Sequence, residues 1–117
     1  MQNNRAVGST YERIAGNYLE ERGYTILKYN YHCRMGEIDI IAKNRSEIIF
    51  VEVKYRKNLK MGNPLEAVNY KKQQAISKCA SYYLLGKGLH NSSVRFDVIG
   101  IIGDEIQQIE NAFEYVR

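Results

Sequence analysis

Residues 36–56 read GEIDIIAKNRSEIIFVEVKYR, and this stretch decides the fold. Two segments rich in β-branched and aromatic residues, 37–42 and 48–55, flank the polar segment 43–46. Strands favour such residues, and a short polar segment between two of them is typical of a hairpin. The sequence therefore predicts two antiparallel strands joined by a tight turn.

One helix is predicted on each side of this hairpin. Ser9 and Glu12 form a capping box, and the apolar residues that follow at helical spacing predict a helix that ends at Gly23. Asn63 and Pro64 are typical of an N-cap and a first helical residue, so we expect the second helix to begin there.

Three further strands complete the expected order. Residues 24–31 have strand composition, 94–102 become almost wholly apolar as in a central strand, and 105–109 suit an edge strand. The second helix should end near 86–88, where two glycines occur. The order α-β-β-β-α-β-β predicts a single α/β domain over residues 1–117, with a mixed central sheet and helices packed on it.

The charge of the chain is unevenly distributed. Residues 1–96 contain 16 basic and 8 acidic side chains, a net charge of +8, whereas residues 97–117 contain 1 basic and 5 acidic ones. This distribution favours a polyanionic partner on one side of the domain, although a solvated surface explains it as well. No apolar run approaches the roughly 20 residues of a membrane span, and no signal peptide follows the N-terminus, so we expect a cytoplasmic protein that does not bind membranes.

Cys33 and Cys79 are the only cysteines, and neither belongs to a metal-binding spacing. In a cytoplasmic protein such cysteines are usually buried apolar residues. We therefore expect neither a disulfide nor a zinc site.

Charged residues alternate with apolar ones along both strands of the hairpin. The period of two places Glu37 with Asp39 on one face, and Glu52 with Lys54 on one face. Carboxylates that converge between apolar runs form a hard-oxygen site for Mg²⁺ or Mn²⁺, with a lysine beside it. The alternative is a solvated face on which Lys54 pairs with Glu52 or Asp39.

The hairpin resembles the D…ExK core of the restriction-endonuclease-like (PD-(D/E)xK) nucleases. Asp39 matches its aspartate, Glu52-Val53-Lys54 matches its ExK, and Ile38 stands where restriction enzymes have proline. More closely, the chain is similar to the YraN-like family of that superfamily. This similarity covers almost the whole chain and includes the segments 8–12, 62–68 and 95–98. The α-β-β-β-α-β core of the superfamily also matches the predicted order.

The resemblance implies a role for each candidate residue. Asp39 and Glu52 would be ligands of Mg²⁺ or Mn²⁺, and Lys54 would be the catalytic lysine. Glu12 occupies the place of the first-helix carboxylate that archaeal Holliday-junction resolvases add to their metal site, although the capping box also explains it.

Nucleic-acid contacts are expected from basic and polar side chains after the third strand and on the second helix. This set consists of Arg56, Lys57, Lys60, Lys71, Lys72 and Gln73. A solvent-facing side of the helix is the alternative for Lys72 and Gln73. Arg95 and Asp97 are expected to pair with neighbours instead of binding substrate.

These observations predict a Mg²⁺-dependent endodeoxyribonuclease that hydrolyses phosphodiester bonds of DNA, by analogy branched or structured DNA. A branched substrate would require two sites and hence a homodimer. Two alternatives stay open: a non-catalytic nucleic-acid-binding module of the same fold, and an assembly factor whose basic face binds a protein.

Overall fold

The computed structural model describes residues 4–58, 60, 62 and 68–116, with the backbone alone for residues 4–9. The elements are α1 (Asn4–Glu21), β1 (Thr25–Cys33), β2 (Gly36–Asn44), β3 (Glu47–Arg56), α2 (Tyr70–Gly86), β4 (Ser93–Ile102) and β5 (Glu105–Phe113). Their order is the predicted one, and β5 is four residues longer than expected.

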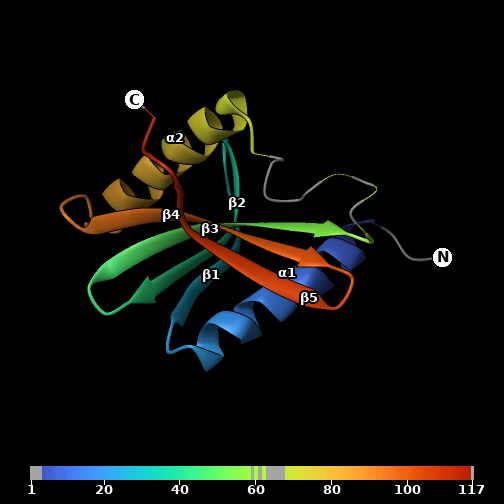
Figure 1. The fold of residues 1–117 in the computed structure, drawn as a ribbon. Helices are drawn as coiled ribbons and strands as arrows, with labels where there is room; N and C mark the ends of the chain where they lie inside the picture. Colours follow the sequence, from blue (N-terminus) through green and yellow to red (C-terminus); the bar gives the residue numbers. More distant parts are fainter. Residues whose placement is uncertain (1–3, 59, 61, 63–67, 117) are drawn as a thin grey trace.

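The five strands form one mixed sheet in the order β1-β2-β3-β4-β5 (Figure 1). The β2–β3 pair is antiparallel, as predicted, and closes through a turn in which Arg45 has a φ of 58°. β3 and β4 are parallel because the chain crosses over through α2, whereas β4 and β5 are antiparallel. The predicted α/β class, mixed sheet and edge position of β5 are confirmed.

The helices cover opposite faces of the sheet (Figure 1). Ala15 and Leu19 of α1 pack with strand residues such as Val51 into one apolar cluster, the α1-side cluster. Ile76 of α2 packs with Phe50 into a second one, the α2-side cluster. Consecutive residues of β3 thus enter different cores. This explains why the strand is apolar over most of its length.

The alternation of β2 is interrupted at Asp39. Ile38 packs into the α2-side cluster and Ile40 into the α1-side cluster, although residues two apart normally share a face. On β1, Asn30 lies between the residues paired with Ile40 and Ile38 and has a φ of 51°. The alternation of β2 is therefore irregular between Ile38 and Ile40, and the period of two does not continue through Asp39.

The predicted start of the first helix is wrong. α1 begins at Asn4, so Ser9 lies inside the helix and Glu12 is not its N3 residue. The capping-box pattern is short and local, and nothing upstream of Ser9, such as a proline, stops the helix from extending. Glu12 therefore needs another explanation than capping.

The second helix begins later than predicted. Asn63 and Pro64 lie outside the described residues, and α2 begins at Tyr70 with Asn69 as its N-cap. The Asn69 Oδ1 accepts a hydrogen bond from the Lys72 backbone N–H at 2.9 Å. Both asparagines suit a cap by residue type, and only the fold selects Asn69.

The prediction that the cysteines are unpaired is also wrong. Cys33, at the end of β1, forms a disulfide with Cys79 on the buried side of α2, and their Cα atoms are 6.2 Å apart. This distance is normal for a disulfide. Composition and compartment contain no information about which cysteines the fold brings together.

Arg95 and Asp97 pair with each other, as predicted, and join β4 to its neighbours. The Asp97 carboxylate is fully buried and accepts hydrogen bonds from Arg95 Nε at 2.8 Å and from the Asn111 backbone N–H at 2.9 Å. Arg95 also forms ion pairs with Glu47 on β3 and Glu110 on β5. The cluster fixes the β4–β5 side of the sheet and is structural.

Replacing Asp97 should therefore destabilise the protein strongly. We expect Asp97→Asn to lower the free energy of unfolding by about 3 kcal/mol, because Arg95 loses its buried partner. Glu110→Gln is the control: its side chain is 63% exposed, and its loss should cost less than about 1 kcal/mol. Urea unfolding of both variants measures the difference, and equal costs would contradict this account.

Candidate metal and lysine site

The site forms where β2 separates from β3. Their paired register ends at Ile40 and Val51, although both strands continue beyond it. The Val53 backbone N–H donates to Asp39 Oδ2 at 2.8 Å. A side-chain oxygen of Asp39 thus accepts from the β3 backbone beyond the end of the ladder, and this bond fixes the carboxylate at the opening.

Glu52 lies beside this opening on β3 and is 5% exposed. Two ammonium groups contact its Oε1: Lys72 Nζ at 3.0 Å and Lys54 Nζ at 3.7 Å. Burial and the nearby charge of Asp39 raise the pKa of Glu52 to about 7, in spite of both lysines. The prediction that Glu52 and Lys54 share one face is confirmed, and the ion pair between them is the contact that the alternative interpretation predicted.

Burial lowers the pKa of Lys54, and the ammonium of Lys72 lowers it further, while Glu52 opposes the change. The pKa of Lys72 is raised instead: burial acts against this, but Glu52 outweighs it. The two lysines are therefore not equivalent. Lys54 is the less exposed of the two and, with its lowered pKa, loses its proton more easily than Lys72.

Glu12 approaches from the opposite face of the sheet, on α1. It is 9% exposed, and among the described residues its Oε2 has no hydrogen-bond partner. Burial, followed by the charge of Asp39, raises its pKa to about 7, whereas a hydrogen bond with the Asn30 side chain acts against the increase. An unpaired buried carboxylate oxygen is costly in a purely structural residue.

A tyrosine pair holds Glu12 and Lys54 in place. The rings of Tyr11 and Tyr55, each adjacent in sequence to one of these residues, stack with centroids 3.8 Å apart. They join α1 to β3 at the end of the α1-side core. The position of Glu12 is thus set by packing.

The carboxylates suit a hard divalent cation by their chemistry. Glu12, Asp39 and Glu52 supply only oxygen ligands, and among the described residues Glu12 Oε2 is buried without a hydrogen-bond partner. Burial first, and then the charge of Asp39, raise the pKa values of Glu12 and Glu52, and a bound cation would lower them. Across the described residues, however, no three metal-ligating side chains already form a group around one point. In this structure the ammonium of Lys72 contacts the Glu52 Oε1 that a metal ion would need as a ligand.

The predicted nucleic-acid-binding residues divide into three groups. Arg56, at the end of β3, donates to its neighbour's carbonyl oxygen, and Lys57 and Lys60 follow it as exposed side chains. Lys71 is exposed on the first turn of α2, and Lys72 is drawn into the site. Gln73 instead donates to the Val68 carbonyl at 3.1 Å, which secures the start of the helix.

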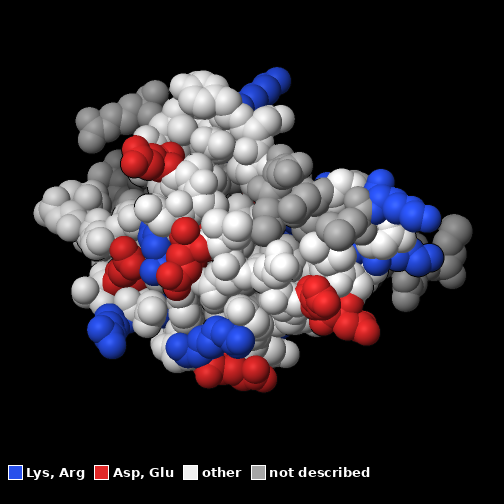
Figure 2. Space-filling view, in the orientation of Figure 1, with Lys and Arg blue, Asp and Glu red and all other residues white. Residues whose placement is uncertain are grey.

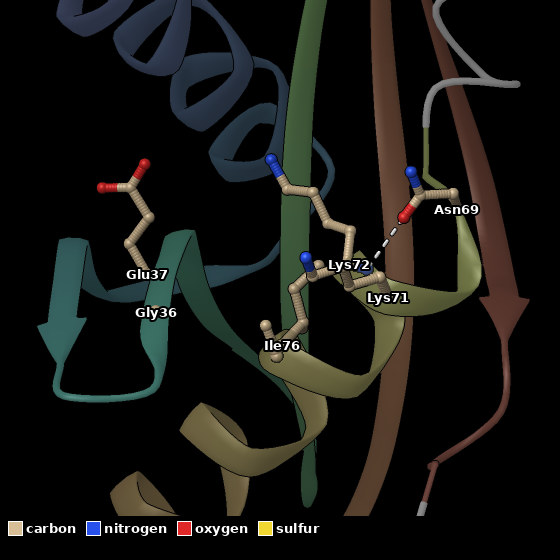
Figure 3. Close-up of a pocket in the computed structure, with 7 residues that line it drawn as sticks. Gly36, Glu37, Asn69, Lys71, Lys72 and Ile76 are labelled. Carbon is tan, nitrogen blue, oxygen red and sulfur yellow. Dashed lines mark hydrogen bonds between the residues drawn. The ribbon is translucent and has the colours of Figure 1, made fainter.

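A cavity of about 320 Å³ lies beside the site (Figure 3). Lys71 and Lys72 extend from the first turn of α2 on one side, and Gly36 and Glu37 of β2 form the other. Glu37, predicted to lie with Asp39, is exposed here and pairs with His32 at 3.2 Å. The cavity and the site share Lys72, whereas Glu12, Asp39 and Glu52 do not line the cavity.

Charges of both signs occur on the surface. Figure 2 shows acidic and basic side chains interspersed on the face that carries β5, and Lys and Arg side chains on the side where Figure 1 shows the end of β3. The acidic residues near the C-terminus lie on β4, in the β4–β5 turn, and on or after β5. The turn, which contains Asp104 and is followed by Glu105, lies beside the basic segment after β3, because the Gly103 backbone N–H donates to the Arg56 carbonyl oxygen at 3.0 Å.

Sequence reasoning missed Asn30 and the position of Lys72 inside the site. The signal for Asn30 was weak, since asparagine tolerates positive φ but occurs in ordinary strands too. Lys72 gave no signal that distinguished it from Lys71.

The fold and the site together define a small α/β domain with a buried carboxylate–lysine site at the opening between two strands. The sequence profile of the Uncharacterised protein family UPF0102 matches residues 11–101, and the chain belongs to this family.

Relatives of nearly the same length occur in several bacteria. UPF0102 proteins of Lachnoclostridium phytofermentans and Clostridioides difficile are each 49% identical over 113 residues, covering 96% and 95% of this chain and 96% and 99% of their own. One from Syntrophus aciditrophicus is 47% identical over 118 residues, covering 97% of this chain and 93% of its own. No helix in the described part of the chain combines the length and apolarity that a membrane crossing requires.

Without metal, the site should make stability depend on pH. Glu12 and Glu52 have folded-state pKa values of about 7, above their ordinary values. The stability they contribute is complete at low pH and is lost as the pH rises through about 7. We expect Glu12→Gln to match wild type at pH 5 and to exceed it by about 1–3 kcal/mol at pH 8.

Unfolding by urea in EDTA at both pH values measures this effect. Glu20→Gln, an exposed position on the same helix, is the control and should leave the pH dependence unchanged. A Glu12→Gln variant that is less stable than wild type by the same amount at both pH values would show that Glu12 is an ordinary structural residue.

Proposed function

We propose that this protein is a divalent-metal-dependent endonuclease that hydrolyses phosphodiester bonds of DNA, with a restriction-endonuclease-like fold. The observation that carries the proposal is the convergence of Asp39, Glu52 and Lys54 at the separation of β2 from β3. The superfamily resemblance of the hairpin supports it, and so does the buried, unpaired oxygen of Glu12.

Asp39, Glu52 and Glu12 would hold Mg²⁺ or Mn²⁺. When bound, the ion would neutralise charge on the scissile phosphate and lower the pKa of a water molecule. The protein contributes a fixed position for each carboxylate: the Val53 N–H orients Asp39, and the packing of α1 orients Glu12.

Lys54 would act on the reacting phosphate. Its ammonium lies beside Glu52, where it can stabilise the negative charge that develops on a phosphate oxygen. Its lowered pKa makes it a better proton donor than an ordinary lysine, which also suits it to protonate a leaving oxygen.

The basic segment after β3 would hold the DNA backbone. Arg56, Lys57 and Lys60 come shortly after Lys54 in the chain. A DNA strand bound to them would therefore extend from the site. Lys71 adds positive charge at the N-terminus of α2, where the helix dipole also attracts anions. These contacts position phosphates without reading sequence. A branched DNA would need two such sites, and hence a homodimer.

Cleavage is the direct test. Wild type should cut at least one of duplex, nicked, flap, four-way or single-stranded DNA with Mg²⁺ or Mn²⁺, and EDTA should abolish the activity. Lys54→Ala should lower the cleavage rate by about 100-fold or more while leaving DNA binding nearly unchanged, because the charge acts mainly in the transition state. Lys87→Ala, exposed at the end of α2, is the control.

Failure of wild type on every DNA substrate with both metals would overturn the proposal. If the same protein still bound DNA tightly, the non-catalytic binding module would replace it. Cleavage of RNA alone would support metal-dependent hydrolysis of phosphodiester bonds but contradict DNA as the substrate.

Binding should be largely electrostatic and should weaken steeply with salt. Replacing both Lys57 and Lys60 by alanine should reduce the slope of log affinity against log salt by up to about two, one for each lost phosphate contact. The control replaces Lys43 and Lys87, which lie together near the start of β3. An unchanged slope in the Lys57/Lys60 variant would exclude this segment from the interface.

A further inference from the structure

Glu52 is contacted by two lysines that belong to different elements of the fold. Lys54 is on the same strand, and its position follows from the alternation of β3. Lys72 reaches Glu52 from α2 and makes the shorter contact, 3.0 Å against 3.7 Å. The ammonium of Lys72 is thus the nearest cation to the most buried carboxylate of the site.

The place of Lys72 on its helix is electrostatically unfavourable. It lies in the first turn of α2, which contains no acidic residue, and the positive end of a helix dipole repels a cation. Glu52 supplies the compensating attraction. The side chain of Lys72 is 36% exposed and lines the cavity beside the site, so its ammonium has space to move away from Glu52 (Figure 3).

We infer that Lys72 is an internal counter-cation that neutralises Glu52 in the metal-free protein and competes with a divalent ion for the same carboxylate oxygen. The inference rests on the proposed function, which places a metal ion at Glu52. Like charges at one carboxylate oxygen repel, so an ion that binds Glu52 displaces the Lys72 ammonium into the cavity. Beside Lys71, the displaced ammonium is available to a phosphate.

This role differs from that of an ordinary salt bridge. A lysine that only stabilises the fold leaves metal affinity unchanged when it is removed, whereas a competing cation raises that affinity on removal. Lys71 provides the matched comparison: it is the adjacent lysine on the same turn and lines the same cavity, but it is exposed.

Calorimetric titration with Mn²⁺ alone tests the inference. The proteins are wild type, Lys72→Met, Lys71→Met and Lys72→Arg, each shown to be folded by circular dichroism. The titration is done at pH 8, above the pKa of about 7 of Glu52 in wild type. Since Lys72 lowers this pKa, its removal strengthens competition by protons, and the gain in Mn²⁺ affinity that is measured is the smallest that the lysine can cause. We expect Lys72→Met to bind Mn²⁺ about tenfold more tightly than wild type, equal to about 1.4 kcal/mol. Lys71→Met should stay within about twofold of wild type by the same conversion, and Lys72→Arg should bind no more tightly than wild type.

The outcomes separate this inference from the proposed function. Equal Mn²⁺ affinity in wild type and Lys72→Met, or an equal gain in Lys71→Met, overturns the inference alone. Binding by Lys72→Met where wild type shows none supports it strongly. No binding by any of the four proteins overturns both the inference and the metal site.

Discussion

The hydrogen bond from the Val53 backbone N–H to Asp39 accompanies the separation of β2 from β3, and the rest of the site depends on this separation. A continuous ladder would leave no room between the strands, and residues on opposite faces of the sheet could not meet. Because the ladder ends at Ile40, Glu12 on α1 and Glu52 on the α2 side both come close enough to Asp39 for its charge to raise their pKa values. On β1, Asn30 has a positive φ next to the same part of β2.

The electrostatics of the site work against stability. Burial first, and then the charge of Asp39, raise the pKa values of Glu12 and Glu52, because both effects disfavour the ionised carboxylates inside the fold. Lys54 and Lys72 offset part of these effects at Glu52, but nothing in the described residues pairs with Glu12 Oε2. By contrast, the fully buried Asp97 accepts hydrogen bonds from Arg95, from the Gln108 side chain and from the Asn111 backbone N–H. Within one small domain, a structural acid is fully paired and a candidate functional one is not.

Prediction from the sequence succeeded where a pattern is local and repeated. The hairpin, the order of helices and strands along the chain, and the shared face of Glu52 and Lys54 follow from strand composition and the period of two. It failed where one short motif had to fix a boundary. The Ser9 capping box lies inside α1, and α2 begins at Tyr70 with Asn69 as its N-cap, whereas the predicted N-cap, Asn63, lies outside the described residues. The disulfide between Cys33 and Cys79 could not be predicted, because residues distant in sequence give no sign of being neighbours.

The sequence by itself determined the class of the fold and the identity of the acids and the lysine on the hairpin, because apolar periodicity specifies which segments are strands and which are helices. Only the tertiary structure decided which charges meet. Asp39 belongs to the site because it accepts from the Val53 backbone N–H, whereas Glu37 is exposed and pairs with His32. Lys72 belongs to it because it contacts Glu52, whereas Lys71 is exposed. Both choices depend on packing between elements far apart in the chain, and no local pattern encodes such a distance.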